Sequence, residues 1–224
     1  MKLLQIMRPQ HWAKNAFVFA GLIFGQKITD PLAVGRAVGA FFCFCLAASA
    51  IYIFNDIIDR KADCLHPEKR KRPIAAGNVG IGSAAVVSAL CATAAIVGSF
   101  ALARNFAIVI LAYIALMILY SLLFKRMMIM DCLVISIGFC LRAIAGAIVV
   151  GVFISPWLII CTFALCLFWR SASAGAKYFC FVKTANLSAR RWPAIRPSCS
   201  LTCLMLPAAW RWYVFCYMRW MAGH

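Results

Sequence analysis

Acidic residues are scarce in this sequence of 224 residues, which contains six Asp and Glu against 23 Lys and Arg. Charged residues of both signs make up 13% of the chain and hydrophobic residues 65%, whereas ordinary soluble domains have about 25% charged residues. So little charge cannot cover the surface of a water-soluble domain. The composition, with a mean hydropathy of +0.91, therefore excludes a soluble globular fold and predicts a membrane protein.

Cysteine motifs for metal are also missing. The chain has 12 Cys but no Cys-x-x-Cys pair, and its 3 His residues do not have the spacing of a zinc site. Several cysteines lie inside apolar stretches, where a thiol behaves as a small hydrophobic side chain; these are Cys43, Cys45, Cys91, Cys140, Cys161 and Cys166. We therefore expect the cysteines to serve packing and not metal binding.

Six apolar stretches follow one another along the chain, at residues 16–26, 37–54, 79–103, 105–124, 128–150 and 156–169. The middle four approach the ~20 residues that a helix needs to cross the hydrocarbon of a bilayer, whereas the first and last are short. The first stretch is followed by others and lacks a clear cleavage site, so we do not interpret it as a removable signal peptide. The pattern predicts an all-α fold, a polytopic bundle of transmembrane helices.

The basic residues, which give a net charge of +17, lie mostly between the apolar stretches. In a soluble chain this charge would favour nucleic acid. Here the cations precede the first stretch and follow the second and fourth, as the positive-inside rule requires of segments that face the cytoplasm. We therefore expect no nucleic-acid partner, and a multi-pass protein integral to the inner or plasma membrane.

Four of the six acids crowd into one short segment that continues directly from the second apolar stretch. Spacings of three and four place three carboxylates and a neighbouring amide on one helical face: Asn55, Asp56, Asp59 and Asp63. Like charges this close repel, so a hard divalent cation such as Mg²⁺, which takes carboxylate and amide oxygens, would explain the grouping. The alternative is a solvated helix end in which carboxylates pair with Arg60 or Lys61.

A cationic loop follows the acids, with four consecutive basic residues, Lys69 to Arg72, between Pro67 and Pro73. A solvated loop could have this composition. Positive side chains next to carboxylates also suit an anionic ligand that is held between a metal ion and the cations, as in diphosphate sites.

Three further residues are candidates for a site. Lys125 follows the fourth apolar stretch, and Asp131 lies at the mouth of the fifth. Arg142 lies about three turns deeper, where an arginine must face a cavity, a partner acid or a bound anion. A ligand role and a structural pairing are both open for Arg142, and we favour the ligand.

Together these segments resemble the UbiA-type prenyltransferases, whose first signature is an Asn-Asp-x-x-Asp-x-x-x-Asp run at a helix end. Residues 55–63 match it at every specified position. The resemblance covers about residues 7–168 and is closest to decaprenyl-phosphate phosphoribosyltransferases, because of residues 8–15, residues 66–77, Tyr120-Ser121, Lys125, Asp131 and Leu141-Arg142.

This resemblance implies a Mg²⁺-dependent transferase that moves a phosphoribosyl group from phosphoribosyl diphosphate to a polyprenyl (decaprenyl) phosphate, a step of cell-wall supply. It implies a catalytic set of Asp56, Asp59 and Asp131, and a Mg²⁺ site of Asn55, Asp56, Asp59 and Asp63. It implies substrate phosphates held by Lys14, Tyr52, Lys69, Lys125 and Arg142. The chemistry needs no protein nucleophile, because the lipid phosphate attacks the sugar as diphosphate departs. Lipid length and oligomeric state are left open.

The resemblance stops after residue 168. Residues 169–224 are rich in Arg and Trp and contain no Asp or Glu, unlike residues 1–168, which we expect to form the transmembrane catalytic domain. A divergent tail or a basic membrane-surface segment could have this composition. We favour a frameshift, which would alter or remove the last helices of the family bundle and could leave the product inactive.

Two other functions are open. An aromatic prenyltransferase would use a prenyl diphosphate and a ring such as 4-hydroxybenzoate, but such enzymes carry a second aspartate-rich motif, and Asp131 is the single acid beyond the first cluster. A non-catalytic membrane protein or transporter would favour acids near the middle of the bilayer, whereas these acids gather at one face.

Overall fold

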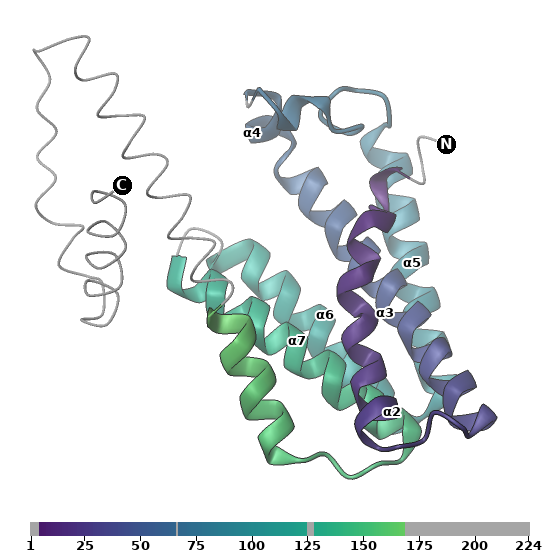
Figure 1. Ribbon diagram of the computed structural model, residues 1–224. Helices are drawn as coiled ribbons and strands as arrows, with labels where there is room; N and C mark the ends of the chain where they lie inside the picture. The colour runs from purple at the N-terminus through teal and green to yellow at the C-terminus, as the bar shows by residue number, and fades with distance from the viewer. Residues whose placement is uncertain (1–4, 66, 125–127, 169–224) are drawn as a thin grey trace, which may run out of the picture. The chain divides into compact units, whose positions relative to one another are not determined.

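The computed structural model describes residues 5–65, 67–124 and 128–168, and the regular elements in these ranges are all helical. The all-α prediction is thus confirmed. Lys125 and the tail of residues 169–224 lie outside the described residues. The elements in chain order (Figure 1) are η1 (Pro9–Phe19), α2 (Ala20–Phe24), α3 (Pro31–Ile58), α4 (Arg60–Leu65), η2 (Lys69–Lys71), α5 (Ile81–Leu102), α6 (Arg104–Leu119), η3 (Tyr120–Phe124), α7 (Met128–Val150) and an apolar helix at Pro156–Phe168.

Four helices in the described part are long and apolar enough to cross a membrane: α3, α5, α6 together with most of η3, and α7. They fall on the four middle apolar stretches of the sequence, as predicted. The outer two stretches differ. The first forms the 3-10 helix η1 and the short α2, and the last forms the short apolar helix Pro156–Phe168.

Helix α3 is the central element and packs most extensively against α5. Its start is fixed by Asp30, whose Oδ1 accepts a hydrogen bond from the backbone N of Leu32 at 3.0 Å, and by Pro31 in the first turn. Small buried residues let the two backbones approach, and the Ser88 hydroxyl of α5 donates to the Ala50 carbonyl of α3 at 2.9 Å. The small residues of α3 are Ala33, Ala37, Ala40, Ala47, Ala48 and Ala50.

The N-terminal helices lie directly on the backbone of α7. A Cβ atom added at Gly146 would fall 1.8 Å from the carbonyl oxygen of Val18, and one added at Gly21 would fall 2.5 Å from the backbone N of Ala147. Both distances are far below van der Waals contact. Glycine at these two positions is therefore what lets η1 and α2 pack on α7.

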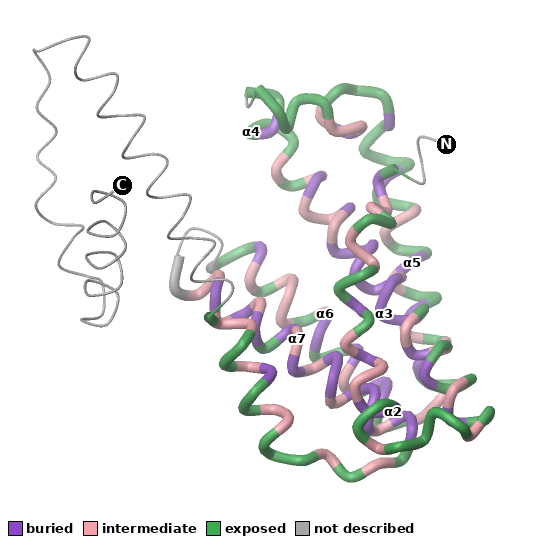
Figure 2. The backbone as a smooth tube through the Cα atoms, viewed as in Figure 1, coloured by how far each residue is buried: buried purple, intermediate pink, exposed green. Residues whose placement is uncertain are grey.

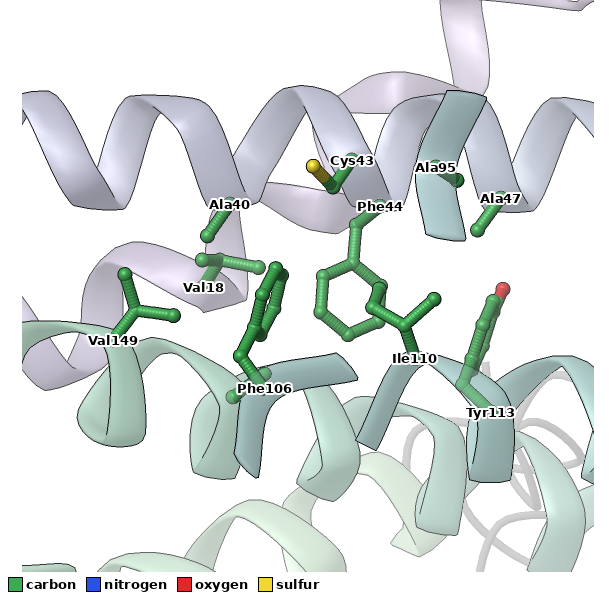
Figure 3. Packing of buried hydrophobic residues seen from close by; sticks show 11 residues of the cluster. Val18, Ala40, Cys43, Phe44, Ala47, Ala95, Phe106, Ile110, Tyr113 and Val149 are labelled. Atoms are coloured by element: carbon green, nitrogen blue, oxygen red, sulfur yellow. The ribbon is translucent and has the colours of Figure 1, made fainter. Parts of the chain in front are cut away.

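Three aromatic side chains hold the middle of the core together (Figure 3). The ring of Phe44 on α3 lies 6.0 Å from that of Phe106 and 5.4 Å from that of Tyr113, both on α6. Val18 and Val149 extend the same cluster. The buried residues concentrate on α3 and α7, whereas α5 and α6 keep exposed apolar side chains that would face lipid (Figure 2).

Candidate functional site

The acidic segment lies where α3 gives way to α4. Helix α3 ends at Ile58 and α4 begins at Arg60, so the continuous helix predicted here is interrupted at Asp59. The interruption is slight, because the backbone N of Asp59 donates to the Asn55 carbonyl at 2.9 Å and that of Asp63 to the Asp59 carbonyl at 2.8 Å. Helical spacing is kept, and this end of α3 lies near the start of η1, where Arg8 contacts Asp56. Figure 1 shows the course of α3 and α4.

One cation joins two of the carboxylates. Nη1 of Arg72 lies 3.1 Å from Oδ1 of Asp56 and 2.6 Å from Oδ2 of Asp63. The carboxylate side chains are only 5% and 4% exposed, whereas that of Arg72 is 29% exposed. The guanidinium therefore covers a pair of buried acids that would be costly without a partner. Asp63 pairs with Arg72 and not with its helical neighbours.

A second arginine reaches Asp56 from the start of the chain. Nη2 of Arg8 lies 2.5 Å from Oδ1 and 2.7 Å from Oδ2 of Asp56, and its side chain is 18% exposed. Arg8 has φ 51°, in the left-handed region that residues other than glycine rarely adopt. A strained backbone at a residue that grips a buried acid is typical of functional sites.

A small apolar cluster brings these charged residues together. Ile6 of the N-terminal segment, Ile53 of α3 and Ile74 of the cationic loop are almost fully buried against one another with Val79 and Ala84. Each isoleucine lies two or three residues from one member of the charged group, Arg8, Asp56 and Arg72 respectively. Burial of the cluster therefore fixes segments that are far apart in sequence, so that the ion pairs form.

The N-terminal segment is also tied to α3 by polar contacts. Nε1 of Trp12 donates to the Ser49 hydroxyl at 3.1 Å, and that hydroxyl donates to the Met7 carbonyl at 2.9 Å. The predicted phosphate ligand Tyr52 lies beneath this segment, with its ring 5.3 Å from that of His11. The guanidinium of Arg8 lies 5.6 Å from the same ring of Tyr52.

The environment of His11, in the same segment, changes the acidity of its imidazole. Partial burial lowers the pKa of its imidazole from 6.5, and the positive charges of Lys14 and Arg8 lower it further. His11 is therefore neutral near pH 7, and it adds no charge to a site already rich in arginine.

Oxygen atoms that could bind a divalent cation are present, although they do not form a metal site in the ligand-free fold. Within residues 5–65, 67–124 and 128–168, no three His, Cys, Asp or Glu side chains form a group that could hold a metal ion. Asn55, however, has a buried Oδ1 without a hydrogen-bond partner, which is uncommon in folded proteins. An unpartnered amide oxygen beside carboxylates is a ligand set that fits Mg²⁺.

The other predicted cations lie at the surface. Lys14 and Lys69 are exposed, and so are Arg70 and Lys71, the latter 3.5 Å from Glu68. Of the four consecutive cations, Arg72 is thus the one joined to the buried acids.

Arg8 and Arg72 were not among the site residues predicted from the sequence. A signal was available, because each directly precedes a proline, whose ring restricts the backbone of the residue before it.

Arg142 belongs to a separate, buried cluster. It donates from Nε to Oδ1 of Asn15 at 2.8 Å, from Nη1 to the Gly138 carbonyl at 2.7 Å, and from Nη2 to the Tyr113 hydroxyl at 2.9 Å. Three aromatic rings lie within 5.8 Å of its guanidinium carbon: Phe44, Tyr113 and Phe139.

Arg142 and the acids occupy different levels of the bundle. Phe44, beside Arg142, precedes Asp56 on α3 by about three helical turns, or roughly 18 Å. Asp131, also predicted for the site, accepts a short hydrogen bond from the Tyr120 hydroxyl across the start of α7. The structure thus brings Asp56 and Asp63 together, and it leaves Arg142 with other partners.

Comparison with known sequences gives a family match and several relatives. The sequence pattern of the UbiA prenyltransferase family matches residues 15–178. Decaprenyl-phosphate phosphoribosyltransferase of Mycolicibacterium smegmatis is 40% identical over 162 residues, which are 70% of this chain and 51% of that protein. The protein of the same name from Mycobacterium tuberculosis is 32% identical over 97% of this chain and 73% of its own. Nodulation protein NoeC of Azorhizobium caulinodans is 35% identical over 66% of this chain and 48% of its own.

The chain spans about half the length of the first and third of these relatives. Among solved structures, a UbiA homologue from Archaeoglobus fulgidus bound to GPP and Mg²⁺ superposes with a TM-score of 0.68 at 20% identity, over 80% of this chain and 64% of that one. Digeranylgeranylglyceryl phosphate synthase gives 0.64 at 15% identity, over 75% and 58%. At these identities the likeness concerns the fold alone.

Proposed function

The chain belongs to the UbiA prenyltransferase family of integral membrane proteins, and we propose that it transfers a phosphoribosyl group from phosphoribosyl diphosphate to a polyprenyl phosphate. The observation that carries the proposal is the buried pair Asp56 and Asp63 at the end of a membrane helix, next to two arginines. Carboxylates for a metal ion and guanidinium groups for phosphate oxygens are the two halves of a diphosphate site. The names of the similar proteins from mycobacteria support phosphoribosyl as the group transferred.

Mg²⁺ would be held by oxygens from one segment of the chain: Asn55, Asp56, Asp59 and Asp63. Bound there, it supplies positive charge against the donor diphosphate. The Mg²⁺ in the Archaeoglobus fulgidus homologue supports a divalent cation for this fold.

The cations at the same end of the bundle would bind the phosphate oxygens of the donor. Lys14 on η1 and Lys69 on η2 are exposed and therefore accessible to a ligand, and we assign Lys125 and the Tyr52 hydroxyl to the same task. Asp131 would help to place the acceptor. We also keep Arg142 as a phosphate ligand, which would have to exchange its hydrogen bonds to Asn15, Gly138 and Tyr113 for the substrate.

The transfer requires no protein nucleophile. The bond between ribose C1 and the diphosphate oxygen breaks, and the diphosphate leaves with the electron pair. An oxygen of the polyprenyl phosphate forms the new bond to C1. The chain's residues orient the donor, stabilise the charge that develops on diphosphate, and hold the lipid phosphate at the membrane surface.

We place the site at the cytoplasmic face. The basic segments before η1, between α3 and α5, and after η3 favour that side under the positive-inside rule. The acceptor lipid would enter from the bilayer, with its phosphate at the interface.

The proposal is tested in membranes that contain the full chain, supplied with Mg²⁺, polyprenyl phosphate and labelled phosphoribosyl diphosphate. We expect label in the lipid with the wild-type chain and a loss of about 100-fold or more with Asp59→Asn. The matched control is Glu68→Gln, which removes one negative charge from the neighbouring exposed loop and should retain transfer. A second reaction supplies geranyl diphosphate and 4-hydroxybenzoate instead.

The two reactions separate the candidate functions. Label in polyprenyl phosphate that depends on Asp59 supports phosphoribosyl transfer. Prenylation of the aromatic ring without phosphoribosyl transfer would assign the chain to the aromatic branch. A membrane-inserted chain that performs neither reaction would contradict the proposed activity.

A further inference from the structure

The charges of the two buried carboxylates at the end of α3 are already balanced without any ligand. Asp56 and Asp63 contribute two negative charges, and Arg8 and Arg72 contribute two positive charges at 2.5–3.1 Å. A divalent cation that reached Asp56 and Asp63 would meet two guanidinium groups that already balance these two carboxylates. Metal binding at these carboxylates therefore requires that at least one arginine leaves them.

Arg72 is the arginine that can leave. A single nitrogen, Nη1, makes both of its ion pairs, so one movement frees Asp56 and Asp63 together. Its side chain is 29% exposed, against 18% for Arg8, and it extends from the loop after η2 with extended backbone angles, φ −65° and ψ 141°. Water and a bound anion can therefore reach it.

Arg8, in contrast, is held in place. Its neighbour Met7 accepts a hydrogen bond from Ser49, and Ile6 is buried in the apolar cluster. Its Nη2 contacts both oxygens of Asp56, whereas Arg72 contacts one. Arg8 is thus suited to keep Asp56 in place while Arg72 moves.

We infer that Arg72 is an exchangeable counter-ion, which neutralises Asp56 and Asp63 in the ligand-free protein and moves to the phosphate oxygens when metal and diphosphate bind together. This inference rests on the proposed function, since it assumes that the acids hold a metal–diphosphate complex. Binding of the metal ion then favours binding of the diphosphate, and the reverse. The cation displaces Arg72 from the carboxylates, and the displaced guanidinium binds the diphosphate, so the two ligands bind with positive coupling.

Two binding measurements on the full chain in detergent test the exchange without any turnover. The first is the affinity for Mn²⁺ alone, from the electron paramagnetic resonance signal of unbound Mn²⁺. The second is the retention of labelled inorganic diphosphate at a fixed Mn²⁺ concentration. In Arg72→Gln the carboxylates have lost their competitor, so Mn²⁺ alone should bind roughly tenfold more tightly, whereas diphosphate should bind roughly tenfold more weakly.

The matched control is Arg70→Gln, which removes the same charge from an exposed position two residues away in the same loop. It should change either affinity by less than about threefold. If Arg72→Gln behaves as this control does, or weakens Mn²⁺ binding, the exchange is wrong.

A second variant keeps the test informative if Arg72→Gln fails to fold. Arg72→Lys retains the charge on a more strongly hydrated group that holds two carboxylates less well. It should bind Mn²⁺ alone about threefold more tightly than the wild type and keep diphosphate binding within about threefold. Weaker Mn²⁺ binding in Arg72→Lys would overturn the exchange.

Failure of the inference can be distinguished from failure of the proposed function, because neither measurement contains a phosphoribosyl donor or a lipid acceptor. Opposite changes in Arg72→Gln in a chain that shows no transfer would support the exchange and contradict the activity. Transfer by the wild type, with Mn²⁺ affinity unchanged in Arg72→Gln, would overturn the exchange alone.

Discussion

Arg142 donates from Nη2 to the hydroxyl of Tyr113 at 2.9 Å, which joins α7 to α6 inside the membrane-spanning part of the fold. No carboxylate takes part among the described contacts of Arg142. Neutral oxygens of Asn15, Gly138 and Tyr113, together with three aromatic rings, stabilise its charge instead. A cation solvated in this way holds η1, α6 and α7 in register.

Removal of the Tyr113 hydroxyl should therefore destabilise the fold. In Tyr113→Phe the ring stays in the core, but one donor of the buried Arg142 loses its acceptor, at a cost of about 1–3 kcal/mol. The measurement is the melting temperature of the purified protein in detergent. Thr93→Val is the control, because it removes a hydroxyl that is exposed and bonds only within its own helix. Equal melting temperatures for Tyr113→Phe and the wild type would contradict a structural role for this contact.

The close packing of η1 on α7 gives a sharper prediction. Gly146→Ala places a methyl group where the Val18 carbonyl now lies, so the two backbones must separate, with a loss of about 1–3 kcal/mol or more. Gly82→Ala is the control, since nothing lies within 4 Å of its added Cβ and alanine favours the helix. In thermal melts, the Gly146→Ala protein should therefore have a clearly lower melting temperature than the Gly82→Ala protein. A Gly146→Ala protein as stable as Gly82→Ala would show that the contact between η1 and α7 is looser than described.

Substitution of Asn55 should weaken metal binding without lowering stability. Its Oδ1 has no hydrogen-bond partner in the ligand-free fold, so Asn55→Leu should leave the melting temperature unchanged or raise it. The same variant lacks an oxygen ligand and should bind Mn²⁺ with diphosphate about tenfold or more weakly.

Asn105→Leu, at an exposed position near the opposite end of the bundle, is the control for the loss of an amide. It should change neither quantity. If Asn55→Leu retains full binding of Mn²⁺, Asn55 is not a metal ligand.

His11 predicts a dependence of stability on pH. Its pKa in the folded protein is lowered from 6.5, first by burial and then by Lys14 and Arg8. As the pH falls below 6.5, the unfolded chain takes up a proton that the folded chain does not yet accept, so stability is lost towards the lowered pKa. Melting temperatures of the wild type and of His11→Phe, which keeps a ring against Tyr52, should diverge between about pH 8 and about pH 5.5, with the wild type losing more. Parallel curves would contradict this assignment.

The membrane helices and the acidic group could be predicted from the sequence because both depend on local spacing. Uninterrupted apolar runs of about twenty residues have few alternatives to a membrane-spanning helix. Spacings of three and four bring Asp56 and Asp63 to one face of any helix. Each of these expectations needs only the residues of one segment.

The partners of the acids could not be predicted in the same way. Arg8 is separated from Asp56 by 48 positions and Arg72 by 16, so their contacts depend on how Ile6, Ile53 and Ile74 pack together. The sequence contains many cations near the same membrane face, and composition does not distinguish among them. The shared Arg-Pro dipeptide is a local signal, although it gives no direction for either side chain.

The eleven residues of η1 also set how far the N-terminal segment reaches along the bundle. A 3-10 helix rises about 2.0 Å per residue and an α-helix about 1.5 Å, so η1 extends about 22 Å, whereas the same residues as an α-helix would extend only about 16 Å. The contacts at its two ends depend on that extra length, because Arg8 binds Asp56 near the end of α3 and Val18 lies against Gly146 of α7. A change of η1 to α-helical geometry would therefore draw Arg8 away from Asp56 by about 5 Å.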